Sequence, residues 1–193
     1  MEEDGNELNE TILVKALQFY EQMKIRHGVM IIGKTMSGKT TIQRILELAL
    51  NRLSITQGEK FRPVKTVKMN PKAIDDNEFY GYWDASQPPQ WIWGVFSTLM
   101  KEMINEDPRT NRWLLMDGPV DTLWIESMNS LLDDSKILTL NNGERLPLSN
   151  NCRLTFEAEN LDVASPATIS RVGLIYMDEE ELGYEPILKK WVD

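Results

Sequence analysis

The chain has very little of what disulfide-bonded and metal-binding proteins require. Its 193 residues include one cysteine, Cys152, and one histidine, His27. A single cysteine forms no internal disulfide, which fits a reducing compartment, and His27 has no partner His or Cys at metal-ligand spacing. We therefore expect Cys152 to be a small buried strand residue and His27 to have a structural role.

Long apolar runs and an excess of positive charge are also missing. No apolar run approaches the roughly 18 residues of a membrane-spanning helix, and the acidic start Met1-Glu2-Glu3-Asp4 is unlike a secretory signal. Lys and Arg number 21 against 30 Asp and Glu, which gives a formal net charge of −9. We expect neither a membrane partner nor a nucleic-acid partner, and a bound anion must be held locally.

Apolar residues make up 41% of the chain, enough to bury a core, and the length favours one domain. Hydrophobic spacing and turn residues predict helices over 11–24, 41–53, 91–103 and 121–133, strands over 27–32, 63–70, 113–117, 152–157 and 172–177, a hairpin over 137–148 and irregular chain over 71–90. Strands that alternate with helices favour a parallel α/β sheet whose ligand lies at the carboxyl ends of its strands.

The most specific motif is Gly33-Lys34-Thr35-Met36-Ser37-Gly38-Lys39-Thr40, which fits G-x-x-x-x-G-K-[ST]. In such a loop backbone N–H groups converge on phosphate oxygens, Lys39 adds a charge, and the Thr40 hydroxyl can ligate Mg²⁺. The helix that opens at Thr41 adds its positive N-terminal dipole. A chance glycine turn is the alternative, but the strand before the loop and the helix after it favour a site for ATP or ADP with Mg²⁺.

A second half of this site is expected where the apolar strand 113–117 ends on Asp117. In hydrolytic P-loop ATPases the corresponding Asp holds Mg²⁺ through water and the next residue is a Glu that polarises the attacking water. Here the next residue is Gly118, so a base worth about 10²-fold to 10⁴-fold in rate is missing. Asp121, expected to cap the next helix, and Glu126, deeper in that helix, are the candidate substitutes.

The run of residues 117–134 (DGPVDTLWIESMNSLLDD) closely resembles the second AAA+ module of dynein heavy chains, the axonemal type especially. Other similar segments follow the same order along nearly the whole chain: 26–30 (RHGVM), 70–73 (NPKA), 79–81 (FYG), 142–144 (NGE), 156–157 (FE) and 165–171 (SPATISR). The resemblance implies an AAA+ P-loop three-layer α/β sandwich with a five-stranded, mainly parallel sheet, flanking helices and a small β-hairpin insertion.

The resemblance also implies how the chain is organised. Residues 9–178 correspond to the large α/β subdomain, 1–8 to a disordered or tag-like start, and 179–193 to the connection toward a helical lid, as in a piece of a longer protein. The implied whole is a six-module ring motor that moves along microtubules, with intermediate and light chains as further partners. It implies a location in the cytoplasm and cytoskeleton, in the axoneme of a cilium or flagellum.

Within that ring, the first module hydrolyses most of the ATP, and the second, resembled here, binds ATP without turning it over. Gly118 independently favours the same interpretation. The alternatives are an active stand-alone P-loop ATPase or kinase with a non-standard base, and an empty pocket that serves only as a ring interface. Intact Lys39, Thr40 and Asp117 argue against the empty pocket.

Two further residues acquire roles from the resemblance. Glu157 falls where many AAA+ proteins carry a polar sensor, usually Asn, that contacts the γ-phosphate. A carboxylate there repels a triphosphate unless a cation intervenes, so Glu157 is a weak candidate for that contact and pairing with a neighbouring Arg is the alternative. Arg171 falls on the arginine finger that reaches the preceding module, a role worth about 10³-fold to 10⁵-fold; an ordinary surface arginine is the alternative.

The chain departs from the family in the predicted helix 91–103. Family members tend to have Trp-Thr-Asp-Gly where this chain has Trp91-Ile92-Trp93-Gly94. Trp91 and Trp93 either pack against the edge of the sheet or form an exposed contact with a neighbouring module.

Overall fold

The structure is a computed structural model, and it describes residues 10–120, 122–162 and 164–178. The expected start 1–8, the expected connection 179–193 and the expected helix cap Asp121 lie outside the described residues. No helix of the described ranges is long and apolar enough to cross a membrane.

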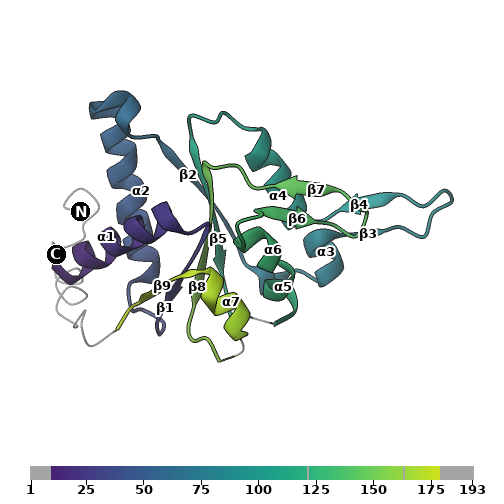
Figure 1. The fold of residues 1–193 in the computed structure, drawn as a ribbon. Helices are drawn as coiled ribbons and strands as arrows, with labels where there is room; N and C mark the ends of the chain where they lie inside the picture. The colour runs from purple at the N-terminus through teal and green to yellow at the C-terminus, as the bar shows by residue number, and fades with distance from the viewer. Residues whose placement is uncertain (1–9, 121, 163, 179–193) are drawn as a thin grey trace.

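A five-stranded parallel sheet forms the centre of the molecule, in the order β2-β5-β8-β1-β9 (Figure 1). Its strands are β1 (Gly28–Ile32), β2 (Val64–Met69), β5 (Asn111–Asp117), β8 (Cys152–Ala158) and β9 (Gly173–Tyr176). All four pairings are parallel. The predicted α/β class and parallel sheet are confirmed.

Helices cover both faces of this sheet. The helices are α1 (Glu10–Ile25), α2 (Lys39–Thr56), α3 (Asp76–Tyr80), α4 (Val95–Asn105), α5 (Thr122–Ser127), α6 (Asn129–Leu132) and α7 (Pro166–Arg171), with short 3₁₀ turns η2 (Gly58–Lys60) and η3 (Pro71–Ala73). Figure 1 shows α1 and α2 on one side of the sheet and α3 to α6 on the other.

Each face of the sheet has its own core. Val29 and Ile31 of β1 pack with α1 and α2, whereas Met30 and Ile32 belong to the core under α4 to α6. Successive strand side chains point to opposite faces, and a central parallel strand is therefore apolar throughout. Cys152, free and fully buried in β8, is the small strand residue that we predicted.

Two hairpins project from the α3 to α6 side: β3 (Gly81–Trp83) with β4 (Trp91–Trp93), and β6 (Ile137–Thr139) with β7 (Arg145–Pro147) (Figure 1). The β6–β7 hairpin was predicted. The helix predicted over 91–103 is wrong at its start, because Trp91–Trp93 is a strand and α4 begins at Val95. Aromatic residues favour strands, and Gly94 lies so close to the Phe79 carbonyl that a Cβ there would be 2.3 Å from its oxygen.

Trp91 and Trp93 are partly buried against the core, so packing describes these two side chains better than a free aromatic surface. Trp83 stacks edge-to-face on Trp91 with 5.6 Å between ring centres, and the Lys101 ammonium lies 3.9 Å from the Trp93 ring centre. Two other expectations are corrected: residues 71–90 contain η3, α3 and β3, and the helix predicted over 121–133 is broken into α5 and α6 around Met128.

Candidate nucleotide-binding site

The loop of residues 33–40, hereafter the phosphate loop, connects the carboxyl end of β1 to α2. Its turn depends on left-handed backbone at Met36 (φ 68°) and Gly38 (φ 86°). A Cβ on Gly33 would lie 2.4 Å from the Met177 carbonyl oxygen and 2.6 Å from Ser37 Oγ, so only glycine fits. Gly38 provides no side-chain cap to α2, and the first N–H groups of that helix are left for another acceptor.

Lys39 folds back over the phosphate loop. Its Nζ donates hydrogen bonds to the carbonyl oxygens of Gly33 (2.6 Å) and Lys34 (2.7 Å). Ser37 is almost completely buried, and its hydroxyl has no hydrogen-bond partner in the described part of the chain. A phosphate bound in the loop could accept hydrogen bonds from both the Lys39 ammonium and the Ser37 hydroxyl.

Thr40 and Glu157 meet across the site. The Thr40 hydroxyl donates a hydrogen bond of 2.7 Å to Glu157 Oε2, joining the first turn of α2 to the end of β8. Glu157 is only 3% exposed, and its Oε1 has no hydrogen-bond partner among the described residues. Burial raises the pKa of Glu157, and the nearby Asp117 raises it further, against the lowering effect of the Thr40 hydrogen bond. The partner of Glu157 is thus a threonine and not the arginine considered above.

Asp117 lies beside Glu157, because these two residues are register partners at the ends of β5 and β8. Asp117 Oδ2 forms an ion pair of 2.7 Å with Lys68 Nζ of β2. Its hydrogen bond with that lysine raises the pKa of Lys68. Sequence reasoning missed Lys68, since nothing in the sequence revealed that β2 would lie next to β5.

A side chain at the position after Asp117 would have to displace the side chain of Asn70. A Cβ on Gly118 would lie 2.7 Å from Asn70 Oδ1. That oxygen is already held in place, because it accepts a hydrogen bond of 3.0 Å from the Lys72 N–H at the start of η3. Of the two substitute bases considered, Glu126 is exposed on α5, and Asp121 lies outside the described residues.

These residues fit a nucleotide with its magnesium ion. Thr40, Asp117 and Glu157 bring hydroxyl and carboxylate oxygens to the end of the phosphate loop, and these are the ligands that Mg²⁺ prefers. The unpartnered oxygen of Glu157 and the unpartnered hydroxyl of Ser37 point to a missing polar ligand. No group of three or more His, Cys, Asp or Glu in the described ranges would hold a metal by itself, so we expect the ion to arrive with phosphates.

A cavity of about 370 Å³ adjoins the phosphate loop at the carboxyl ends of β1 and β9. Its lining residues are Ile32, Gly33, Lys34, Glu159, Tyr176, Met177 and Asp178. No sequence motif pointed to Glu159 or Tyr176, because only the strand order places the carboxyl ends of β8 and β9 on either side of β1.

Arg171 lies at the opposite end of the strands from the phosphate loop, Asp117 and Glu157. It ends α7 just before β9, at the amino end of the strands, whereas the phosphate loop follows the carboxyl end of β1. Its Nε donates a hydrogen bond of 2.5 Å to Asp133 Oδ1, and its Nη1 donates one of 2.6 Å to the Ala167 carbonyl. The structure therefore brings Lys39, Thr40, Asp117 and Glu157 together and leaves Arg171 apart.

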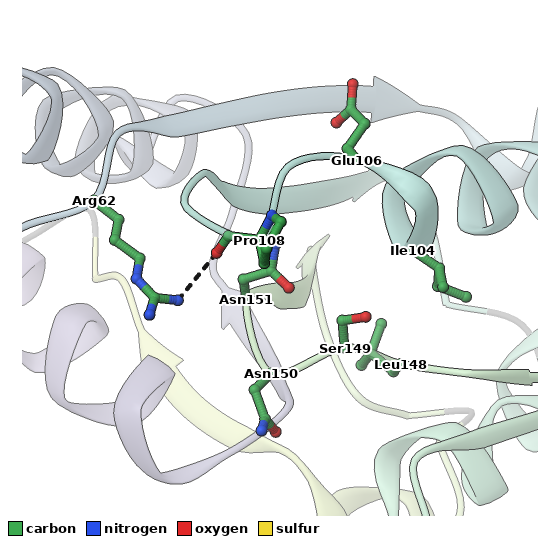
Figure 2. A pocket seen from close by; sticks show the side chains of 8 residues that line it. All are labelled: Arg62, Ile104, Glu106, Pro108, Leu148, Ser149, Asn150 and Asn151. Atoms are coloured by element: carbon green, nitrogen blue, oxygen red, sulfur yellow. Dashed lines mark hydrogen bonds between the residues drawn. The ribbon is translucent and has the colours of Figure 1, made fainter.

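A second hollow, of about 600 Å³, lies at the amino ends of β2, β5 and β8. Figure 2 shows its lining residues: Arg62, Ile104, Glu106, Pro108, Leu148, Ser149, Asn150 and Asn151. Arg62 Nη1 donates a hydrogen bond of 3.2 Å to the Pro108 carbonyl. This hollow is on the opposite edge of the sheet from the phosphate loop and contributes nothing to the nucleotide site.

Comparison with known proteins gives two matching family models. A model described as "AAA domain (dynein-related subfamily)" matches residues 28–172, and one described as "Hydrolytic ATP binding site of dynein motor region" matches residues 1–40.

Individual relatives agree with these models. Dynein axonemal heavy chain 2 of Mus musculus is 43% identical over 191 residues, which are 99% of this chain and 4% of that protein. Dynein axonemal heavy chain 8 of Homo sapiens is 43% identical over 179 residues, 93% of this chain and 4% of that protein. The flagellar inner arm I1 dynein-1-beta heavy chain of Chlamydomonas reinhardtii is 41% identical over 182 residues, 93% of this chain and again 4% of the relative.

The chain thus spans about 4% of the length of these relatives. The resemblance to axonemal dynein heavy chains is confirmed, whereas the number of the module within the ring stays a prediction. The family match covers the phosphate loop, Asp117, Glu157 and Arg171. By this match the chain belongs to the dynein-related subfamily of AAA domains.

Proposed function

We propose that the chain is a nucleotide-binding AAA+ module of a dynein-type microtubule motor, which holds ATP or ADP with Mg²⁺ and hydrolyses it poorly or not at all. The observation that carries this proposal is the combination of a complete phosphate loop with the empty position at Gly118. Lys39, Thr40 and Asp117 retain what binding requires, and the position that would activate water has no side chain.

Binding requires one local rearrangement. The Lys39 ammonium leaves the carbonyl oxygens of Gly33 and Lys34 for the phosphates, which are stronger acceptors. Thr40 would hold the metal directly and Asp117 would hold it through water, and the cavity lined by Glu159 and Tyr176 would receive the nucleoside. When bound, Mg²⁺ would supply positive charge that offsets the charge of the phosphates.

We expect weak hydrolysis because Gly118 has no side chain that could act as a base. A glutamate at 118 would collide with Asn70, which η3 holds in place. The exposed Glu126 is an unsuitable base, because a base must lie within hydrogen-bond reach of the attacking water. We expect a turnover about 10²-fold to 10⁴-fold below that of a module with a positioned carboxylate.

Arg171 is proposed as an arginine finger for the preceding module. Its position at the amino ends of the strands, away from its own phosphate loop, suits a role in trans. Asp133 and the Ala167 carbonyl hold the guanidinium in one orientation, which reduces the entropy lost when it meets a phosphate. In the full motor, Arg171→Ala should lower hydrolysis in the preceding module; unchanged hydrolysis would refute the assignment.

The remaining partners follow from the relatives. We propose neighbouring AAA+ modules as direct contacts, and the microtubule and the intermediate and light chains as partners of the complete motor in an axoneme. The relatives from which these partners are inferred are far longer than this chain, which spans about 4% of their length.

The binding test compares two lysine variants of this chain. Lys39→Ala removes a charged donor worth about 1.5–3 kcal/mol, so the affinity for a fluorescent ADP analogue should fall about 10-fold to 100-fold. Lys65→Ala is the matched control, because Lys65 is an exposed lysine of β2 whose ammonium lies 3.9 Å from Glu106. Equal affinity of the two variants would refute the proposed site.

A further inference from the structure

We infer that Glu157 is a direct ligand of the nucleotide's magnesium ion and shares it with Thr40. The inference rests on the proposed function, since the ion arrives with the nucleotide. It assigns to Glu157 a role different from a γ-phosphate sensor, because the carboxylate would reach the phosphates only through the metal.

The spacing of two oxygens supports this assignment. Thr40 Oγ1 and Glu157 Oε2 are 2.7 Å apart. Mg²⁺ takes octahedral ligands at about 2.1 Å, which puts neighbouring ligand oxygens about 3 Å from each other. The two side chains therefore already stand close to the separation of adjacent ligands, and a metal held by Thr40 has Glu157 within reach.

The second oxygen of Glu157 gives an independent indication. Glu157 is 3% exposed, and its Oε1 has no partner among the described residues. A carboxylate oxygen only accepts hydrogen bonds, and a buried acceptor without a partner is costly. A cation and the waters around it would satisfy this oxygen.

Asp117 already has a cationic partner within the protein, and in this it differs from Glu157. Asp117 Oδ2 is paired with Lys68 Nζ at 2.7 Å, so part of its charge is neutralised within the protein. Lys68 and Lys39 are near enough to lower the pKa of Glu157, but burial raises it more, and neither lysine forms an ion pair with Glu157 among the described contacts. Of the two neighbouring carboxylates, Glu157 therefore has the greater unmet demand for a cation.

This assignment makes nucleotide binding depend on the metal in two opposite ways. Without a divalent cation, the Glu157 carboxylate repels the phosphates. With the cation, the same carboxylate attracts it and so strengthens binding. Glu157→Gln should therefore weaken nucleotide binding in Mg²⁺ but leave it unchanged or stronger in EDTA. Loss of a merely structural residue would not make the effect of the substitution depend on the metal in this way.

The experiment measures the binding of a fluorescent ADP analogue and of Mn²⁺ to this chain, to its Glu157→Gln variant and to its Glu144→Gln variant. Glu144, in the turn of the β6–β7 hairpin, pairs with Lys101 of α4, so its variant controls for the lost charge. Electron paramagnetic resonance reports free Mn²⁺ in the presence of ADP. We expect Glu157→Gln to weaken Mn²⁺ binding about 10-fold or more, and Glu144→Gln to change nothing.

The outcomes separate the two proposals. If the unaltered chain binds no nucleotide with or without metal, the proposed function fails and this inference fails with it. If it binds ADP and Glu157→Gln changes Mn²⁺ affinity less than about twofold, only the inference is overturned. A crystal structure of the unaltered chain with ADP and Mn²⁺ needs no variant: a metal about 2.1–2.3 Å from a Glu157 oxygen supports the inference, and one beyond about 3.5 Å overturns it.

Discussion

Substituting Gly118 tests whether packing keeps the position beside Asp117 empty. The backbone of Gly118 is outside the left-handed region, so alanine can adopt it without strain. Such a Gly→Ala change stabilises a protein by about 0.4–1 kcal/mol, because the unfolded chain loses freedom. Here the new Cβ would lie 2.7 Å from Asn70 Oδ1 and would displace that side chain.

Displacing Asn70 breaks its cap of η3, which is worth about 0.5–2 kcal/mol. The two effects oppose each other, so Gly118→Ala alone should be neutral or destabilising by about 1 kcal/mol. In an Asn70→Ala background the cap is already gone, and Gly118→Ala should then stabilise by about 0.4–1 kcal/mol. The sign of the effect therefore changes with the residue at 70.

Urea unfolding of the four chains measures this as a double-mutant cycle. We expect a coupling free energy of about 1 kcal/mol between Gly118 and Asn70. Effects that add within about 0.3 kcal/mol would contradict this coupling, because they would mean that a side chain at 118 does not displace Asn70.

Two further predictions concern stability. Burial raises the pKa of Glu157 above its ordinary 4.5, so its contribution to stability is fully present below the unfolded pKa and is lost as pH rises through the folded pKa. As the pH rises above the ordinary pKa of 4.5, the urea midpoint of the unaltered chain should therefore fall relative to that of Glu157→Gln. A difference that does not change with pH would contradict this. Phe96 is fully buried against Phe79, with 4.9 Å between ring centres. Phe96→Ala should therefore lower the free energy of unfolding by about 3–5 kcal/mol. A decrease below about 1 kcal/mol would contradict the packing of that core.

Much of the fold follows from local patterns. The buried runs of β1 and β5 predict central strands, because parallel strands covered on both faces are apolar throughout. The motif of the phosphate loop then fixes which end of β1 bears the site. Lys39, Thr40 and Asp117 could be predicted for this reason without the structure.

What could not be predicted depends on contacts between distant segments. The Lys68–Asp117 pair requires β2 to lie beside β5. The Thr40–Glu157 hydrogen bond joins residues 117 positions apart. The β3–β4 hairpin was missed because Ile92 continues the helical spacing of α4. The close approach of Gly94 to Phe79, which ends that pattern, is a tertiary contact.

This chain is proposed to hold a nucleotide without turning it over. One sample with Mg²⁺ can be assayed for both the bound fraction of ATP and the rate of phosphate release. We expect saturable binding that Lys39→Ala abolishes or strongly weakens, with phosphate release far below the roughly 1 s⁻¹ at the low end of enzyme turnover. Steady release of several phosphates per second from the fully occupied chain would contradict this expectation.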